Sequence, residues 1–291
     1  MATIQVRRFS SAQQLLEECR EWLLQEEVAN SLILSVAQRF ADQGAAAQTS
    51  LFAAEVKLGV TRLALGFQAP GRPLMLASPA LPEALGPLAE EWARSLAGTS
   101  TVASHRIVGE PALARVVAEN AARILAGGGS VQSAHEMQIL RIQSAPALKA
   151  PVGGTSRLAT EDEIPQIIRW GVGFARDAGL SDTQEQVAAT FTLAVQRGDI
   201  FVWEDIGELR SMCRLSQTGT GSARISAVYT PPAERGQGYG SAIVAGVTEM
   251  ALSKGSHAVT LYVEKPEVRR LYERIGFTLA CEATEFQIVS G

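Results

Sequence analysis

The residue patterns in the two halves of this 291-residue chain predict the same order of elements: a strand, two helices, three strands, a helix, a strand, a helix and a strand. Such an order is typical of a mixed sheet with helices packed on its faces. The halves share almost no residue identity, so element order alone suggests an ancient duplication. The sequence therefore predicts an α/β fold with two similar domains, each a twisted mixed sheet flanked by helices.

A stretch rich in Pro, Gly, Ala and Ser, residues 144–156, separates the two patterned regions. Periodicity is lost there, as is typical of a linker between domains. The chain also exceeds the roughly 100 to 200 residues of a single domain. We therefore expect one domain at residues 1–145 and a second at 155–291.

Composition and charge narrow the function classes. Apolar residues make up 46% of the chain and charged residues 19%, which indicates a folded protein with a substantial core. No apolar run approaches the roughly 18 residues that span a bilayer, and the first residues lack the pattern of a signal peptide. The net charge is -4 without a cluster of Lys and Arg, which disfavours nucleic-acid binding. We expect a cytoplasmic protein with neither membrane nor nucleic-acid partners.

Cysteines and histidines are few and scattered. They are Cys19, Cys213, Cys281, His105, His135 and His257. No C-x-x-C, H-x-x-x-H or H-E-x-x-H spacing occurs among them. We therefore expect neither a disulfide framework nor a metal site.

Capping residues predict where several helices begin. Ser11 is expected to cap the helix that follows it, and Thr160 and Glu163 have the spacing of a capping box. A further helix is expected over 181–198, capped by the Ser-Asp pair at its start and ended by its final glycine.

The segment "VYTPPAERGQGYG", residues 228–240, has the composition of an anion-binding loop. Pro231 and Pro232 cannot donate to a strand ladder, so the chain must leave the sheet there. The glycines after Arg235 permit positive φ values and let successive N–H groups point into one concavity. An apolar helix expected from about Gly240 adds its positive dipole end. The first half has no such loop, so we expect the chemistry in the second half.

Three phosphate-binding motifs could describe this loop. The glycine spacing and the two prolines fit a dinucleotide fingerprint poorly, and no Gly-Lys-Ser or Gly-Lys-Thr of a Walker loop occurs. Arg235, Gly238 and Gly240 fit R-x-x-G-x-G, and Leu271 and Tyr272 begin an L-Y-x-x-x-G-F motif that ends at "GF" 276–277. Together these motifs resemble the GCN5-related N-acetyltransferases (GNAT), in a tandem form with a degenerate first half.

The resemblance implies that acetyl-coenzyme A binds at the loop. The backbone of Ala227, Val228 and Thr230 would pair with the pantetheine arm where neighbouring strands splay, and the loop amides would hold the pyrophosphate. The implied cofactor-binding residues are Ala227, Val228, Tyr229, Thr230, Arg235, Gly236, Gln237, Gly238, Tyr239, Gly240 and Ser241. The alternative is a tight turn, with the Arg235 side chain in a surface ion pair.

The resemblance also implies that Tyr272 is the general acid that protonates the departing thiolate. Its apolar helical stripe allows a purely core role as well. Glu204 and Glu264 are candidate general bases at strand ends, and each can equally be a solvated surface residue. Where the family often has an asparagine before this helix, the chain has Lys265, which puts one contact to the pantetheine arm in doubt.

These features predict an enzyme that transfers acetyl from acetyl-coenzyme A to a primary amine of a small molecule or peptide, directly and without a metal. Trp170, Phe174 and Arg176 could line the acceptor pocket, although Trp170 can equally be core. Two alternatives are a coenzyme A-binding sensor or assembly module without turnover, and an acyltransferase of the mycothiol-synthase kind. The first half could be a lid, a dimerisation surface of a homodimer, or a remnant.

Overall fold

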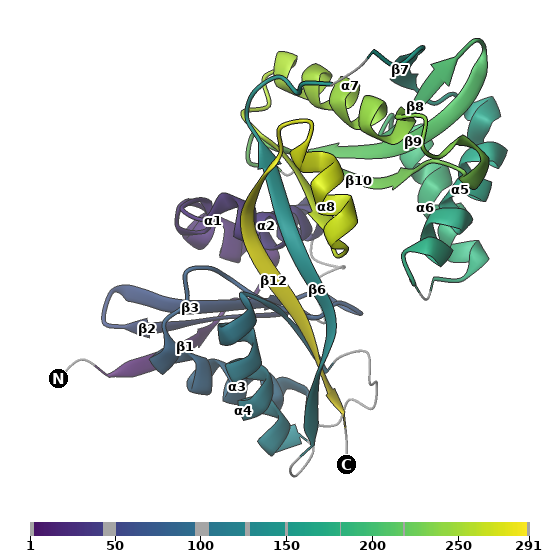
Figure 1. Cartoon of the computed structure of the whole chain (residues 1–291). Helices are drawn as coiled ribbons and strands as arrows, with labels where there is room; N and C mark the ends of the chain where they lie inside the picture. Colours follow the sequence, from purple (N-terminus) through teal and green to yellow (C-terminus); the bar gives the residue numbers. More distant parts are fainter. Residues whose placement is uncertain are drawn as a thin grey trace. The chain divides into compact units, whose positions relative to one another are not determined.

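The computed structural model describes residues 3–42, 51–96, 105–125, 129–148, 151–180, 182–217 and 219–289. Contacts divide the chain into two compact units, and most of their elements are labelled in Figure 1. Unit 1 comprises residues 1–139, 218–220 and 279–291, and unit 2 comprises 140–217 and 221–278. The expected mixed α/β class is confirmed. Every helix within the described residues is too short or too polar to cross a bilayer.

Unit 1 has a mixed sheet between two layers of helices. Its strands follow the order β1-β2-β3-β4-β5-β12-β6. Helices α1 and α2 pack over one apolar core and α3 and α4 over another. The elements of the first half are β1 (Ile4–Arg8), α1 (Ala12–Leu24), α2 (Glu27–Asp42), β2 (Phe52–Leu58), β3 (Thr61–Gln68), β4 (Leu74–Leu76), α3 (Pro82–Leu96), β5 (Arg106–Gly109), α4 (Pro111–Leu125) and β6 (Ser130–Ile142).

Unit 2 repeats this arrangement with the strand order β11-β10-β9-β8-β7. Helices α7 and α8 share one apolar core with the sheet, and α5 and α6 share the other. The elements of the second half are β7 (Thr155–Leu158), α5 (Ile164–Asp177), α6 (Gln184–Gln196), β8 (Ile200–Asp205), β9 (Glu208–Gln217), β10 (Ala223–Tyr229), α7 (Tyr239–Ser253), β11 (Val259–Val263), α8 (Pro266–Glu273) and β12 (Thr278–Val289), with short 3₁₀ turns at Glu161–Glu163 and Pro232–Glu234. The element order expected for both halves is confirmed.

Two of the three expected helix caps are present. Ser11 accepts a backbone N–H at 3.0 Å at the start of α1. Thr160 donates its N–H to the Glu163 carboxylate at 2.8 Å, which completes the expected capping box. The expected Ser-Asp cap of α6 is wrong, although its serine lies outside the described residues. Thr183 caps α6 instead. The Thr183 N–H donates to the side-chain oxygen of Gln186 at 2.8 Å, and the Thr183 hydroxyl accepts from the Gln186 N–H, which is a capping box.

The last strand of the chain belongs to unit 1. β12 pairs antiparallel with β5, with Phe286 opposite Ile107, and Phe286 and Ile288 are buried in the core beneath α3 and α4. The end of β6, Leu140–Ile142, is counted with unit 2. An alternating strand pattern indicates which side chains point inward but not which sheet receives them, so the sequence alone leaves residues 279–291 with the expected second domain.

Candidate functional site

Strand β10 carries a bulge near its end. Ser226 and Tyr229 pair with β9 residues that are two positions apart, so Ala227 and Val228 face a single residue of β9. Ala227 has a φ of +50°, which is uncommon for a residue with a Cβ. The bulge turns backbone groups of β10 out of the regular ladder, as bulges beside functional sites commonly do.

Strands β10 and β11 part just where this bulge begins. The two strands run parallel, and ladder pairs join only Ala223 to Val259 and Arg224 to Thr260. Beyond these pairs β10 continues to Tyr229 and β11 to Val263, and the two described strands make no further ladder pairs with each other. The sheet is therefore open between the carboxyl ends of two parallel strands, a common position for ligand sites in α/β proteins.

The glycine loop leaves β10 at this opening. A short 3₁₀ turn at Pro232–Glu234 follows the strand, and the chain then passes through Gly236 at a φ of +82° and Gly238 at +89°. Residues with a Cβ avoid such φ values, so both positions require glycine. The side chains and backbone of residues 235–238 are exposed, which leaves the loop accessible from solvent.

Helix α7 begins at the end of the loop with unpaired backbone donors. The Ala242 N–H donates to the Gly238 carbonyl at 2.9 Å. The amides of residues 238–241 precede this first bond and therefore have no acceptor within the helix. Tyr239 fixes the helix start, because its hydroxyl donates to Asp205 at 3.1 Å and its carbonyl accepts from Ser211 at 3.2 Å. Loop and helix start form a rigid cradle suited to an anion.

Tyr272 lies on α8 within the core beneath α7 and α8. Its side chain is 6% exposed, and its ring centroid lies 6.1 Å from that of Phe277. Cys213, the β9 residue opposite the bulge, belongs to the same core. Burial, and secondarily the Cys213 thiol, raises the pKa of Tyr272. The tyrosine therefore stays protonated over the neutral range, as a proton donor must.

Buried Cys213 and Tyr272 predict a loss of stability at alkaline pH. Burial raises the pKa of both groups above their unfolded values of about 8.5 and 10. Below pH about 8.5 both groups are protonated in the folded and the unfolded state, so their full contribution to stability is present. Above that pH the free energy of unfolding should fall by up to about 1.4 kcal/mol per pH unit for each group. Urea titrations at pH 7, 9 and 10.5 measure this. Cys213→Ala should flatten the fall between pH 8.5 and 10, and an unchanged slope would contradict the prediction.

The two candidate bases occupy different environments. Glu204 on β8 is held by Arg157, which donates to it at 2.6 Å and also binds Glu163 at 2.6 Å. Glu264 directly follows β11 and is exposed at the edge where β10 and β11 end. The Glu204 carboxylate is therefore held within the network of Arg157, whereas Glu264 lies at the opening itself.

The three expected acceptor-wall residues lie on α5 in unlike surroundings. Trp170 is 6% exposed and its ring centroid lies 6.5 Å from that of Tyr229, within the core. Phe174 is half-buried against the same core. Arg176 is exposed and donates to Asp177 at 3.1 Å. Only Phe174 combines an apolar surface with partial access to solvent.

Two residues that contact the loop, Asp177 and Val152, are not apparent from the sequence. Asp177 at the end of α5 pairs with Arg235 at 2.5 Å. Val152 of the linker lies beside Gly238, where an added Cβ would come within 3.1 Å of its side chain. Neither residue belongs to a local motif, so no signal in the sequence identifies them.

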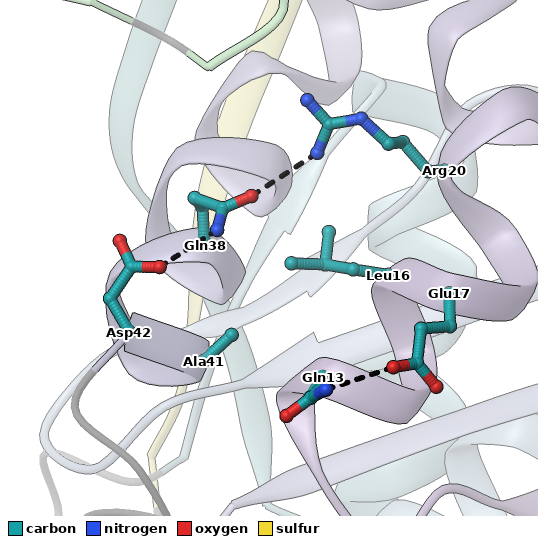
Figure 2. Close-up of a pocket in the computed structure, with 7 residues that line it drawn as sticks. All are labelled: Gln13, Leu16, Glu17, Arg20, Gln38, Ala41 and Asp42. Atoms are coloured by element: carbon teal, nitrogen blue, oxygen red, sulfur yellow. Dashed lines mark hydrogen bonds between the residues drawn. The ribbon is translucent and has the colours of Figure 1, made fainter.

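A hollow of about 390 Å³ lies on unit 1 between α1 and α2 (Figure 2). Its polar side chains bond to one another: Gln13 donates to Glu17, Arg20 to Gln38 and Gln38 to Asp42. It contains none of the residues expected to bind the cofactor or to act in catalysis.

Comparisons with known proteins match the second half to one family. The model of the Acetyltransferase (GNAT) family matches residues 167–277. No sequence among the curated proteins matches the chain.

Solved structures of GNAT proteins share the fold along nearly the whole chain. A GCN5-related N-acetyltransferase from Sphaerobacter thermophilus is 15% identical with a TM-score of 0.62, covering 99% of this chain and 97% of its own. A GNAT-family acetyltransferase from Colwellia psychrerythraea is 13% identical with a TM-score of 0.56, covering 98% and 100%. A tandem GNAT protein from the clavulanic acid biosynthesis pathway is 12% identical with a TM-score of 0.55, covering 99% and 98%. The described architecture is therefore that of two GNAT-like domains.

Proposed function

Because residues 167–277 carry a domain of the Acetyltransferase (GNAT) family, we propose that the chain transfers an acetyl group from acetyl-coenzyme A to a primary amine. The observation that carries the proposal is the amide cradle of residues 236–241, exposed at residues 236–238, at the opening between β10 and β11. The amides of residues 238–241, which have no acceptor within the helix, suit a diphosphate. Gly240 also lies close to Thr230, because an added Cβ would come within 3.2 Å of its hydroxyl. The acceptor is a small molecule or a peptide amine.

The reaction proceeds by direct attack in a ternary complex. The amine nitrogen bonds to the acetyl carbon, the carbon–sulfur bond breaks, and the Tyr272 hydroxyl gives its proton to the departing thiolate. Glu264 first accepts one proton from the ammonium, directly or through water. As the amide forms, the nitrogen gives up its second proton, which returns through solvent to the Tyr272 phenolate. Backbone groups of Ala227 and Val228, displaced from the ladder by the bulge, orient the pantetheine arm. Acetyl-coenzyme A supplies the activated thioester.

The connection of unit 1 that corresponds to the glycine loop offers few amides among its described residues. In the connection from β4 to α3, the N–H groups of Ala77, Ser78 and Leu81 donate within the unit at 2.9, 2.8 and 2.8 Å. Pro79 and Pro82 have no N–H to offer. Most amides of this connection are therefore already used within the unit, which supports a first half that does not bind the cofactor.

Thiol release tests the proposal. The protein is incubated with acetyl-coenzyme A and a library of primary amines, and free thiol is followed together with the mass of the product. Amine-dependent thiol release supports the enzyme. The ion pair of Glu204 with Arg157 favours a second candidate, a coenzyme A-binding module, and binding without turnover on any amine would support it. Failure to bind coenzyme A would overturn both.

Gly238→Ala is expected to weaken coenzyme A binding about tenfold or more. The φ of +89° costs an L-residue about 1–2 kcal/mol, and the new Cβ would come within 3.1 Å of Val152, so the loop amides must shift. Isothermal titration calorimetry measures the Kd. Gly255→Ala is the matched control, because it has a φ of +98° with open space around it at the other end of α7. Equal Kd values for the two variants would contradict the assignment of the loop.

A further inference from the structure

The Arg235 side chain joins three segments around the cradle. Its Nε donates to the Thr230 carbonyl at 3.0 Å, at the exit from β10. A terminal nitrogen donates to the Asp177 carboxylate at 2.5 Å, at the end of α5. The guanidinium carbon lies 5.8 Å from the centroid of the Tyr229 ring. Two of the five guanidinium N–H groups are therefore bound to protein acceptors on either side of the loop.

One face of helix α5 packs against the end of β10. Trp170, Gly173 and Asp177 recur at helical spacing, so they lie on the same face. Trp170 packs beside the Tyr229 ring, and a Cβ at Gly173 would come within 2.4 Å of the Tyr229 hydroxyl. The last turn of α5 is thus seated closely on the end of β10, and Asp177 is the residue of this face that reaches the loop.

Asp177 is the last residue of α5, where its negative charge is repelled by the negative end of the helix dipole. Arg235 offsets this, because its charge faces both the carboxylate and the helix end. The Arg235 hydrogen bond is also the main cause that lowers the pKa of Asp177. For helix stability alone, an uncharged or basic residue at position 177 would serve better. The ion pair therefore has another role.

We infer that Asp177 is a positioning residue for the coenzyme A loop. Resting on the proposed function, this inference adds a residue that holds the cradle without touching the cofactor. Asp177 fixes Arg235, and Arg235 fixes the chain directly before the two positive-φ glycines, so the amides of residues 236–241 stay directed into one concavity. The same contact couples the acceptor-side helix α5 to the donor site.

Asp177→Asn is expected to raise the Kd for coenzyme A about fivefold at low salt, as suits a partly exposed ion pair. The difference from the wild type should disappear near 1 M NaCl, because salt screens the pair. In turnover, the KM for acetyl-coenzyme A should rise by the same factor while kcat stays within about twofold. Asp177→Glu should restore most of the binding. A purely structural role would show neither the salt dependence nor the rescue.

Calorimetry with coenzyme A on four forms of the full chain decides the question: wild type, Asp177→Asn, Arg235→Ala and the double variant. We expect Asp177→Asn to have no further effect in the Arg235→Ala background, because the two residues act through one contact. Asp199→Asn is the control, since its pair with Arg214 is similarly exposed and lies outside the loop. Additive effects, or wild-type affinity in Asp177→Asn, would overturn the inference alone. Absence of binding by the wild type would overturn the proposed function and this inference with it.

Discussion

Tyr272→Phe is expected to lower kcat for acetyl transfer by about 10²- to 10³-fold while the affinity for coenzyme A is retained. The substitution removes only the hydroxyl that would protonate the thiolate. The ring keeps its place beside Phe277 in the core, so the protein should remain folded. Steady-state kinetics with a responsive amine and calorimetry with coenzyme A measure the two effects separately.

The raised pKa of Tyr272 adds a pH test. Because burial keeps this tyrosine protonated well above neutrality, its ionisation should not limit kcat between pH 7 and about 9. Tyr262→Phe on β11 is the matched control, as it removes the same hydroxyl from a half-buried tyrosine of the neighbouring strand and should leave kcat unchanged. An unaltered kcat in Tyr272→Phe would assign Tyr272 to the core alone and remove it from the mechanism.

Phe286→Ala is expected to destabilise unit 1 by about 3–5 kcal/mol, although the residue lies only a few positions from the C-terminal end of the sequence. Phe286 is 2% exposed in the core beneath α3 and α4, and the guanidinium of Arg115 lies 4.8 Å from its ring centroid. Removing the ring leaves a cavity between β12 and these helices. Hydrogen exchange followed by mass spectrometry should show faster exchange in β2, β3 and α3 than in the wild type.

Leu279→Ala provides the control on the same strand, because Leu279 is 39% exposed and its truncation should cost little. Truncating the chain after Thr278 should destabilise unit 1 more than Phe286→Ala does, because it removes the whole strand that pairs with β5. A fragment of residues 1–145 that exchanged as slowly as unit 1 of the full chain would contradict the assignment of β12 to unit 1.

Local sequence determined the elements and the glycine loop of residues 231–240. Ser11 and the Thr160–Glu163 pair mark helix starts because a cap depends on residues within one turn. The two prolines and the glycines of residues 231–240 define the loop because φ limits and missing N–H groups are properties of single residues. These signals were enough to predict the fold class, the repeated element order and the position of the proposed cofactor loop.

Tertiary structure decided which distant groups meet. The alternating pattern of β12 fits either sheet, and only the cores of the two units select the pairing with β5. The bulge at Ala227 depends on its register with β9, which no residue within β10 specifies. Arg157 beside Glu204 and Asp177 beside Arg235 are pairs separated by 47 and 58 positions. Charge and hydrogen bonding act through space, so their partners are fixed by packing of the whole chain and not by local pattern.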